Sequence, residues 1–226
     1  MTKSFFSGII IKTSAQRAGL VCFSRGEIMT RDEIKKLFQQ HSYIMRTAEL
    51  SAARIYYADI QRLLDEGVID KVKRGYYYLV DEQDYSEISI LKRLLPEAIL
   101  CMDTALFYYG YSDRTPLMWH LAVDKDMSKS KTKIDYPFIK AYYFEPNTLQ
   151  LGVTEGEIDG RTVSIYDRDR TICDCLRYIG RMDREIFNKA IQGYVTDPKK
   201  NVPNLTRYAK VLRVQQKVKD LIGVWM

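Results

Sequence analysis

The sequence predicts an α+β protein with two regions in succession, a helical one that ends in a hairpin and a mixed one. Three observations lead to this class. Helical spacing of apolar residues over 31–66 is followed by a glycine and a tyrosine-rich hairpin. Three extended runs rich in β-forming residues occupy the middle of the chain, and helical spacing returns after residue 168. We therefore expect a small mixed or antiparallel sheet in the second region, with helices collected at its end.

The first region begins with a helix over about 31–40, because Thr30 and Glu33 form a Ser/Thr-x-x-Glu capping box before an apolar repeat. Two further helices are expected at about 47–52 and 56–66. In the last of them a buried stripe is predicted at Tyr56, Ile60, Leu63 and Leu64. Gly67 stands where a left-handed residue commonly ends a helix.

A hairpin follows, with an extended segment from Val68, a turn at Lys73-Arg74-Gly75 and a return through "YYYLV". Three helices followed by a hairpin is the order of a winged helix-turn-helix. In that fold the exposed start of the recognition helix enters the major groove of DNA and the wing contacts the backbone. The candidate DNA-binding residues that lie off the buried stripe are Arg54, Tyr57, Gln61 and Arg62, and the candidates on the wing are Lys71, Lys73 and Arg74.

The polar stretch 81–86 marks a boundary, so we expect an N-terminal appendage at 1–28, a DNA-binding domain at 29–83 and an α+β domain at 84–226. An amphipathic helix should end near Pro96. A strand at "AILCM", a helix capped by Asp103 and strands at "LMWHLAV", "PFIKAYYF" and "TVSIYD" follow, with a hairpin turn at Asp159-Gly160. Expected helices then start at Asp169, at Asp183 and, through about Leu221, at Asn204.

Composition limits the class of protein. Hydrophobic residues make up 46% of the 226, enough for real cores, and a net charge of +6 favours an anionic partner. The longest apolar run near the N-terminus is Ile9 to Ile11, and no 18-residue apolar span occurs, so neither a signal peptide nor a membrane helix is expected. Four widely spaced cysteines indicate a reducing cytoplasm, and no metal or cofactor is expected.

The second basic stretch lies near the C-terminus and includes Arg207, Lys210, Arg213 and Lys217. Such a face is either simply solvated or a second contact for flanking DNA or an acidic partner. An enzyme is the weaker alternative. Asp103, Asp167, Asp169 and Asp174 resemble metal-binding carboxylates, but arginines interleave with them and no phosphate-binding glycine loop is present. His120 sits in a strand pattern, without a nucleophile motif, so no catalytic residue is assigned.

Taken together, the passage "ELSAARIYYADIQRLLDEGVIDKVKRGYYYL" and the stretches "MDTALFYYGYSD" and "DRDRTICDCLR" resemble the AbiEi family of antitoxins from bacterial abortive-infection (type IV) toxin–antitoxin systems. The resemblance covers about residues 30–220. It implies an autorepressor that binds inverted repeats at its own promoter. The resemblance also implies a DNA contact for Tyr56, beside the helix and wing residues named above, although the helical stripe would bury this residue. It also implies that the second domain counters a nucleotidyltransferase-like toxin without forming a stable complex. The alternatives are a protein-interaction adaptor and a general winged-helix regulator without an antitoxin role.

Overall fold

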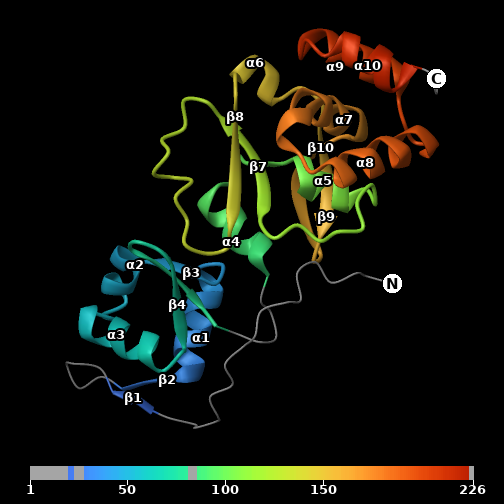
Figure 1. Ribbon diagram of the computed structural model, residues 1–226. Coiled ribbons are helices and arrows are strands. Elements are labelled where there is room, and N and C mark those ends of the chain that lie inside the picture. Colours follow the sequence, from blue (N-terminus) through green and yellow to red (C-terminus); the bar gives the residue numbers. More distant parts are fainter. Residues whose placement is uncertain (1–19, 23–27, 81–85, 224–226) are drawn as a thin grey trace. The chain divides into compact units, whose positions relative to one another are not determined.

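The computed structural model describes residues 20–22, 28–80 and 86–223 of a mixed α+β chain (Figure 1). The chain divides into two compact units. Unit 1 comprises Met1–Pro96 together with Lys133–Pro137, and unit 2 comprises Glu97–Thr132 and Phe138–Met226. The division differs from the expected boundary at 84 because the helix that precedes Pro96 belongs to unit 1, as does a five-residue segment from far along the sequence. The expected boundary stretch and most of the expected appendage lie outside the described residues.

Unit 1 contains four helices and five strands among its described residues. Its elements are β1 (Leu20–Cys22), β2 (Ile28–Thr30), α1 (Arg31–Gln40), β3 (Ile44–Arg46), α2 (Thr47–Ala52), α3 (Tyr57–Asp65), β4 (Ile69–Lys73), β5 (Tyr76–Leu79) and α4 (Glu87–Leu94). β1 pairs with β2, and β3, β5 and β4 form an antiparallel sheet in that order. The three predicted helices and the hairpin are thus confirmed within a residue or two.

The capping box predicted at the start of α1 is present. Thr30 N donates to Glu33 Oε2 over 2.7 Å, and Glu33 N donates to Thr30 Oγ1 over 3.2 Å. Gly67 has φ +67° and ends α3 in the left-handed region, as its position predicted. Local sequence signals therefore fix both ends of this helical segment.

Both faces of the three-stranded sheet are covered, because neighbouring strand residues point to opposite sides. Met45 packs against the α1–α3 core, with Phe38, Leu50 and Ile60 among its buried members. The adjacent Ile44 faces the other way. It joins a second apolar cluster formed by Ile44, Val72 and Ile90, with Tyr76, Tyr78, Leu94, Ile134 and Tyr136 against it. The sheet is thus held between the three helices on one side and α4 on the other.

Unit 2 is built on a five-stranded mixed sheet, ordered β8-β7-β6-β10-β9, with the helices α5, α7 and α8 beside it (Figure 1). Its described elements are β6 (Ile99–Leu100), α5 (Met102–Tyr108), β7 (Trp119–Asp124), β8 (Ile139–Phe144), α6 (Pro146–Leu149), β9 (Val153–Ile158), β10 (Arg161–Tyr166), α7 (Arg168–Arg177), η1 (Ile179–Arg181), α8 (Arg184–Thr196), α9 (Val202–Val211) and α10 (Gln215–Leu221). β8 with β7 and β6 with β10 are parallel pairs, and the other two pairs are antiparallel.

The predicted hairpin turn at Asp159-Gly160 is confirmed, since both residues have positive φ, +52° and +70°. Its first strand, β9, was not predicted. The sequence of β9 is VTEGEI, which has two acids and a glycine, and five of its six residues are partly or fully exposed. An edge strand of this kind carries little of the apolar alternation by which strands are recognised.

Three predicted helix starts in unit 2 are wrong. α5 begins after Cys101, so Asp103 lies in its first turn instead of capping it. α7 is capped by Asp167, whose Oδ1 accepts a hydrogen bond from Arg170 N over 2.7 Å, while Asp169 is buried within the helix. The final helix is two helices, of which the first is capped by Asn201, not by Asn204. The cap of α8 at Asp183 is confirmed.

The break between α9 and α10 has a local cause. Arg213 adopts φ +58°, and Val214 N donates back to Ala209 O over 2.9 Å. Leu212 and Val214 are buried on either side of it. Anchoring these two side chains in the core of unit 2 requires the chain to turn there, which a single straight helix could not do.

A buried ion pair lies at the centre of unit 2. The side chains of Arg170 and Asp174 are both fully buried, and Arg170 Nε lies 3.0 Å from Asp174 Oδ2. Arg170 Nη1 also donates to the carbonyl oxygens of Thr148 and Leu151, over 2.6 and 2.7 Å. The guanidinium carbon is 4.1 Å from the centroid of the Tyr166 ring. One arginine thus ties α7 to α6 and to the loop that follows it.

Candidate nucleic-acid interface

α2 and α3 are joined by a short turn that buries its apolar residue. Arg54 has φ +63°, and Ile55 N donates to Leu50 O over 2.9 Å. Ile55 is fully buried beside Leu50 and Ile60. This turn fixes the crossing of the two helices and leaves Arg54 exposed at its outer side.

The start of α3 is the most open part of the candidate surface. Tyr57 is 76% exposed and Tyr56 is 39% exposed. The prediction that Tyr56 belongs to the buried stripe is wrong, because Tyr56 precedes the first turn of α3 and has extended backbone. Gln61 and Arg62, one turn further on, are half-buried. The stripe itself is carried by the buried Ile60 and Leu63.

The acidic side chain in the first turn of α3 is buried, and another lies at the opposite end of the helix. Asp59 is fully buried, and its Oδ2 accepts a hydrogen bond from Tyr56 N over 3.0 Å. Glu66 lies at the opposite end of the helix, with its carboxylate 4.0 Å from Arg31. The N-terminal turn of α3 therefore presents tyrosines and a helix N-terminus, not a carboxylate, to a partner.

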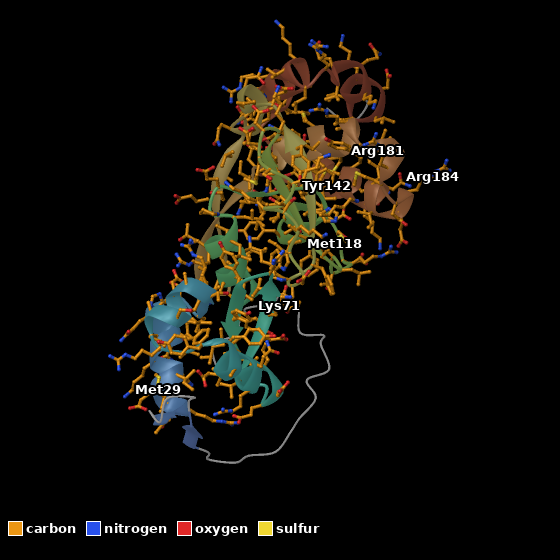
Figure 2. All side chains as sticks on the ribbon, turned by 90° about the vertical axis from the view of Figure 1, so that its left-hand side faces the viewer. Met29, Lys71, Met118, Tyr142, Arg181 and Arg184 are labelled. Carbon is orange, nitrogen blue, oxygen red and sulfur yellow. The ribbon has the colours of Figure 1, made fainter. Side chains whose placement is uncertain are left out.

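The hairpin of β4 and β5 carries the three predicted basic residues at or near its turn. Lys71 is exposed on β4 (Figure 2), and Arg74 is exposed at the turn, where Gly75 has φ +78°. The pairing shifts register between Lys71 and Lys73. Lys73 is half-buried, with its Nζ 4.5 Å from the centroid of the Tyr76 ring. The hairpin tip is thus a cationic site that also has aromatic surface.

Two contacts join the hairpin turn to the start of α2. Thr47 N and Thr47 Oγ1 both donate to Gly75 O, over 3.0 and 3.3 Å. Arg46, which precedes α2, is exposed and has its guanidinium carbon 6.0 Å from the Tyr76 ring centroid. Sequence reasoning missed both Arg46 and Thr47, since nothing local in the sequence relates them to a turn 28 residues later. Their placement holds the basic hairpin turn at a fixed position relative to the two helices.

Comparison with protein families identifies this same segment. Residues 32–80 match the family of AbiEi antitoxin transcriptional regulators. The match covers α1 to the end of the hairpin, and it confirms the family resemblance over these residues. No curated protein matches the chain in sequence. We call residues 32–80 the AbiEi segment. It lies in unit 1 and contains every predicted DNA-binding residue.

Outside the AbiEi segment, the predicted second basic surface lies on α9, α10 and the turn between them. Arg207, Lys210 and Arg213 are exposed. Lys217 is half-buried, and its Nζ donates to Leu176 O over 2.8 Å. It therefore caps the C-terminal end of α7. Three of the four basic groups remain accessible to an anionic partner.

Two of the aspartates considered as metal ligands, Asp167 and Asp169, accept hydrogen bonds from neighbouring helices and loops. Asp167 Oδ2 accepts a hydrogen bond from Tyr208 OH over 2.8 Å. Asp169 Oδ1 accepts from Tyr194 OH and from Asn201 N, over 2.7 and 2.8 Å. Within the described parts of the chain, no three His, Cys, Asp or Glu side chains gather as a metal site. These carboxylates fasten α7 to α8 and α9.

His120 and Asp103 come together in unit 2, but in a form unsuited to acid–base catalysis at neutral pH. Asp103 N donates to His120 Nδ1 over 3.3 Å, and His120 Nε2 lies 3.8 Å from Asp103 Oδ2. Burial lowers the pKa of His120 to about 3, with a further contribution from Lys140. Although the two groups are close enough for an ion pair, the imidazole is therefore neutral at pH 7. A base this weak would contribute little to proton abstraction.

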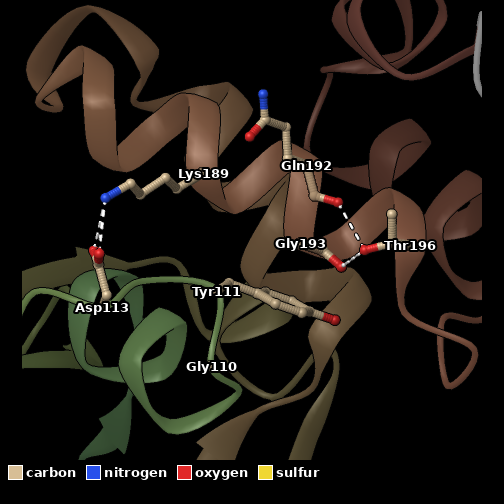
Figure 3. Close-up of a pocket in the computed structure, with 7 residues that line it drawn as sticks. All are labelled: Gly110, Tyr111, Asp113, Lys189, Gln192, Gly193 and Thr196. Atoms are coloured by element: carbon tan, nitrogen blue, oxygen red, sulfur yellow. Dashed lines mark hydrogen bonds and ion pairs between the residues drawn. The ribbon is translucent and has the colours of Figure 1, made fainter.

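A surface pocket in unit 2 lies between the end of α5 and α8 (Figure 3). Its lining consists of Gly110, Tyr111, Asp113, Lys189, Gln192, Gly193 and Thr196. Lys189 Nζ lies 2.8 Å from Asp113 Oδ2, and Tyr111 OH donates to Asp197 Oδ2 over 2.6 Å. A Cβ on Gly193 would stand 2.9 Å from Tyr111 Cδ1. The stretch "YYGYSD" thus packs against α8 through a tyrosine and a surface ion pair.

Among the described residues, no helix is both long and apolar enough to cross a membrane.

Proposed function

We propose that the AbiEi segment is a winged helix-turn-helix that binds double-stranded DNA, with α3 in the major groove and the hairpin as the wing. The observation that carries the proposal is the pair of hydrogen bonds from Thr47 to Gly75 O, inside a segment that matches a family of transcriptional regulators. They connect the wing tip to the helix pair. A helix in the major groove and a wing on the DNA backbone can contact the same duplex only if their positions relative to each other are fixed.

Different parts of this surface have different tasks. Arg54, Tyr57 and Gln61, at the turn and first turns of α3, are suited to base edges and to the methyl group of thymine. Tyr56 and Arg62 flank them. Lys71, Lys73 and Arg74 neutralise phosphates, which gives affinity without sequence information.

We further propose that the whole chain is a non-enzymatic, cytoplasmic antitoxin that represses its own operon at inverted repeats. What supports this beyond residue 80 is the resemblance of "MDTALFYYGYSD" and "DRDRTICDCLR" to AbiEi antitoxins. In this proposal the second α+β region counters a nucleotidyltransferase-like toxin without a stable complex. The basic residues Arg207, Lys210, Arg213 and Lys217 are a candidate second contact for flanking DNA.

The DNA-binding part is tested by fluorescence anisotropy with the full chain. One duplex carries the DNA upstream of its own gene, and the other carries the same bases in shuffled order. Gln61→Ala and Tyr57→Ala should weaken binding to the upstream duplex by about ten-fold or more each, since a base contact contributes about 1–3 kcal/mol. Binding to the shuffled duplex should hardly change. Lys36→Ala, on the exposed side of α1, serves as the control.

The antitoxin part is tested by co-expression with the nucleotidyltransferase gene beside its own. The full chain should restore growth, and the Lys73→Ala, Arg74→Ala double variant should restore it equally well while losing repression of a promoter reporter. Failure of the wild-type chain to restore growth would refute the antitoxin role.

A second function is favoured by the 76% exposure of Tyr57, since exposed aromatic side chains are also typical of protein interfaces. In this alternative the winged helix binds a protein partner. Equal affinity for the upstream and shuffled duplexes, together with a stable complex with a neighbouring gene product, would favour the adaptor.

A further inference from the structure

Residues Lys133–Pro137 belong to unit 1, although the sequence places them more than 50 residues after its hairpin. We call this segment the strap. Asp135 N and Tyr136 N both donate to Val72 O, over 2.8 and 3.2 Å. The ring of Tyr136 stacks on Tyr78 with centroids 6.1 Å apart, and its hydroxyl donates to Glu87. The strap is therefore fastened to the hairpin through its backbone and through a tyrosine.

The strap meets β4 beside its basic residues. Val72 lies between Lys71 and Lys73 and is fully buried, and Ile134 packs in the same apolar cluster. β4 is an edge strand of the three-stranded sheet, so its outer carbonyl groups need partners that the sheet does not supply. The two strap amides meet that need at Val72.

The first residue of the strap, Lys133, is exposed. Two residues of chain span at most about 7 Å, so Lys133 stays close to the point where Asp135 N reaches Val72 O. Lys133 thus adds a fourth positive charge to those of Lys71, Lys73 and Arg74.

Asp135 is also exposed and carries the opposite charge. Its backbone amide fastens the strap, whereas its carboxylate would repel a passing phosphate. The strap thus offers two neighbouring side chains with opposite predicted effects on an anionic partner.

We propose that the strap is part of the DNA-contacting surface, with Lys133 binding a backbone phosphate beside the wing. The proposal rests on the proposed DNA-binding function of the AbiEi segment. If the strap only covers the edge of β4, its backbone bonds matter and the charge of Lys133 does not. Side-chain variants that keep the backbone therefore separate the two roles.

The experiment measures the affinity of the full chain for the upstream duplex between 0.05 and 0.3 M salt. Each phosphate contact contributes about 0.9 to the slope of log K against log salt. Lys133→Ala should flatten the slope by about 0.9 and weaken binding about five-fold at 0.15 M salt. Lys133→Arg should keep the wild-type slope, and Asp135→Asn should strengthen binding at low salt. Lys36→Ala removes the same charge from α1 and should leave the slope unchanged.

A slope for Lys133→Ala equal to that of Lys36→Ala would overturn the proposal, provided that the Lys73→Ala, Arg74→Ala variant has a flatter slope. In that case the strap is only an edge cover and the winged helix still binds DNA. If the wild-type chain shows no salt-dependent binding, the proposed DNA-binding function fails first, and the role of Lys133 fails with it.

Discussion

Replacing Asp174 by alanine leaves the fully buried guanidinium of Arg170 without its ion-pair partner. The charge cannot be relieved by deprotonation, because arginine keeps its proton at all accessible pH values. Breaking a buried pair by removing one partner costs about 3–5 kcal/mol. The hydrogen bonds from Arg170 Nη1 to the carbonyl groups of Thr148 and Leu151 remain possible, so the loss comes from the carboxylate. We expect the free energy of unfolding to fall by that amount.

Urea denaturation followed by circular dichroism at pH 7 measures this change. Asp113→Ala is the matched control, because Asp113 also pairs with a cation over 2.8 Å, but its side chain is 74% exposed. That variant should unfold like the wild type, since exposed pairs contribute little. A decrease of less than about 1 kcal/mol for Asp174→Ala would contradict the reasoning, because so small a cost is typical of solvated pairs.

Three further predictions concern single side chains. Because burial lowers the pKa of His120 from 6.5 to about 3, its contribution to stability is present above pH 6.5 and is lost as the pH falls toward 3. At pH 5 the loss is about 2 kcal/mol, so His120→Gln should show a smaller decrease in stability between pH 7 and 5 in urea titrations; an unchanged pH dependence would argue against a neutral buried imidazole. Gly193→Ala should lower the melting temperature, because the new methyl group would meet Tyr111 Cδ1 at 2.9 Å; Gly180→Ala is the comparison, because a methyl group there would meet no other atom within 4 Å. Thr47→Val should reduce the free energy of DNA binding by more than it reduces the free energy of unfolding, because Thr47 Oγ1 helps to hold the hairpin turn through Gly75 O. A DNA affinity equal to that of the wild type would indicate that the hydrogen bond from Thr47 N alone holds the turn.

The parts of the fold that the sequence predicted are those with local signals. The Thr30–Glu33 capping box, the left-handed Gly67 and the Asp159-Gly160 turn each need only a few neighbouring residues. All three are present. The helices and the hairpin of the AbiEi segment were predictable for the same reason, since they follow one another without interruption.

Features that depend on long-range packing could not be predicted. In "DRDR" two aspartates are equally good caps by sequence, and the contacts of Asp169 with Tyr194 and Asn201 decide which one is buried. The contact of the strap with β4 could not be predicted, because Asp135 and Tyr136 form hydrogen bonds with Val72, which lies more than 60 residues earlier in the sequence. The helical spacing places Tyr56 on the buried stripe, but Tyr56 precedes the first turn of α3, so that spacing does not apply to it.

For the candidate site, the sequence predicted residues of α3 and of the hairpin, but it did not predict the contacts that hold these two elements in place. Arg46 and Thr47 lie in a stretch with no basic or turn pattern of its own. Their importance appears only when Gly75 O is found within hydrogen-bond distance of Thr47. A hairpin turn and a helix start far apart in sequence are brought together by the pairing of β3 with β5.

The most direct test of the central claim is the salt dependence of binding to the upstream duplex for the wild type and for the Lys73→Ala, Arg74→Ala double variant. If both side chains neutralise phosphates, the slope of log K against log salt should flatten by about 1.8 and affinity at 0.15 M salt should fall about thirty-fold. The same affinity and slope for both proteins would contradict the claim that this hairpin is a DNA-binding wing.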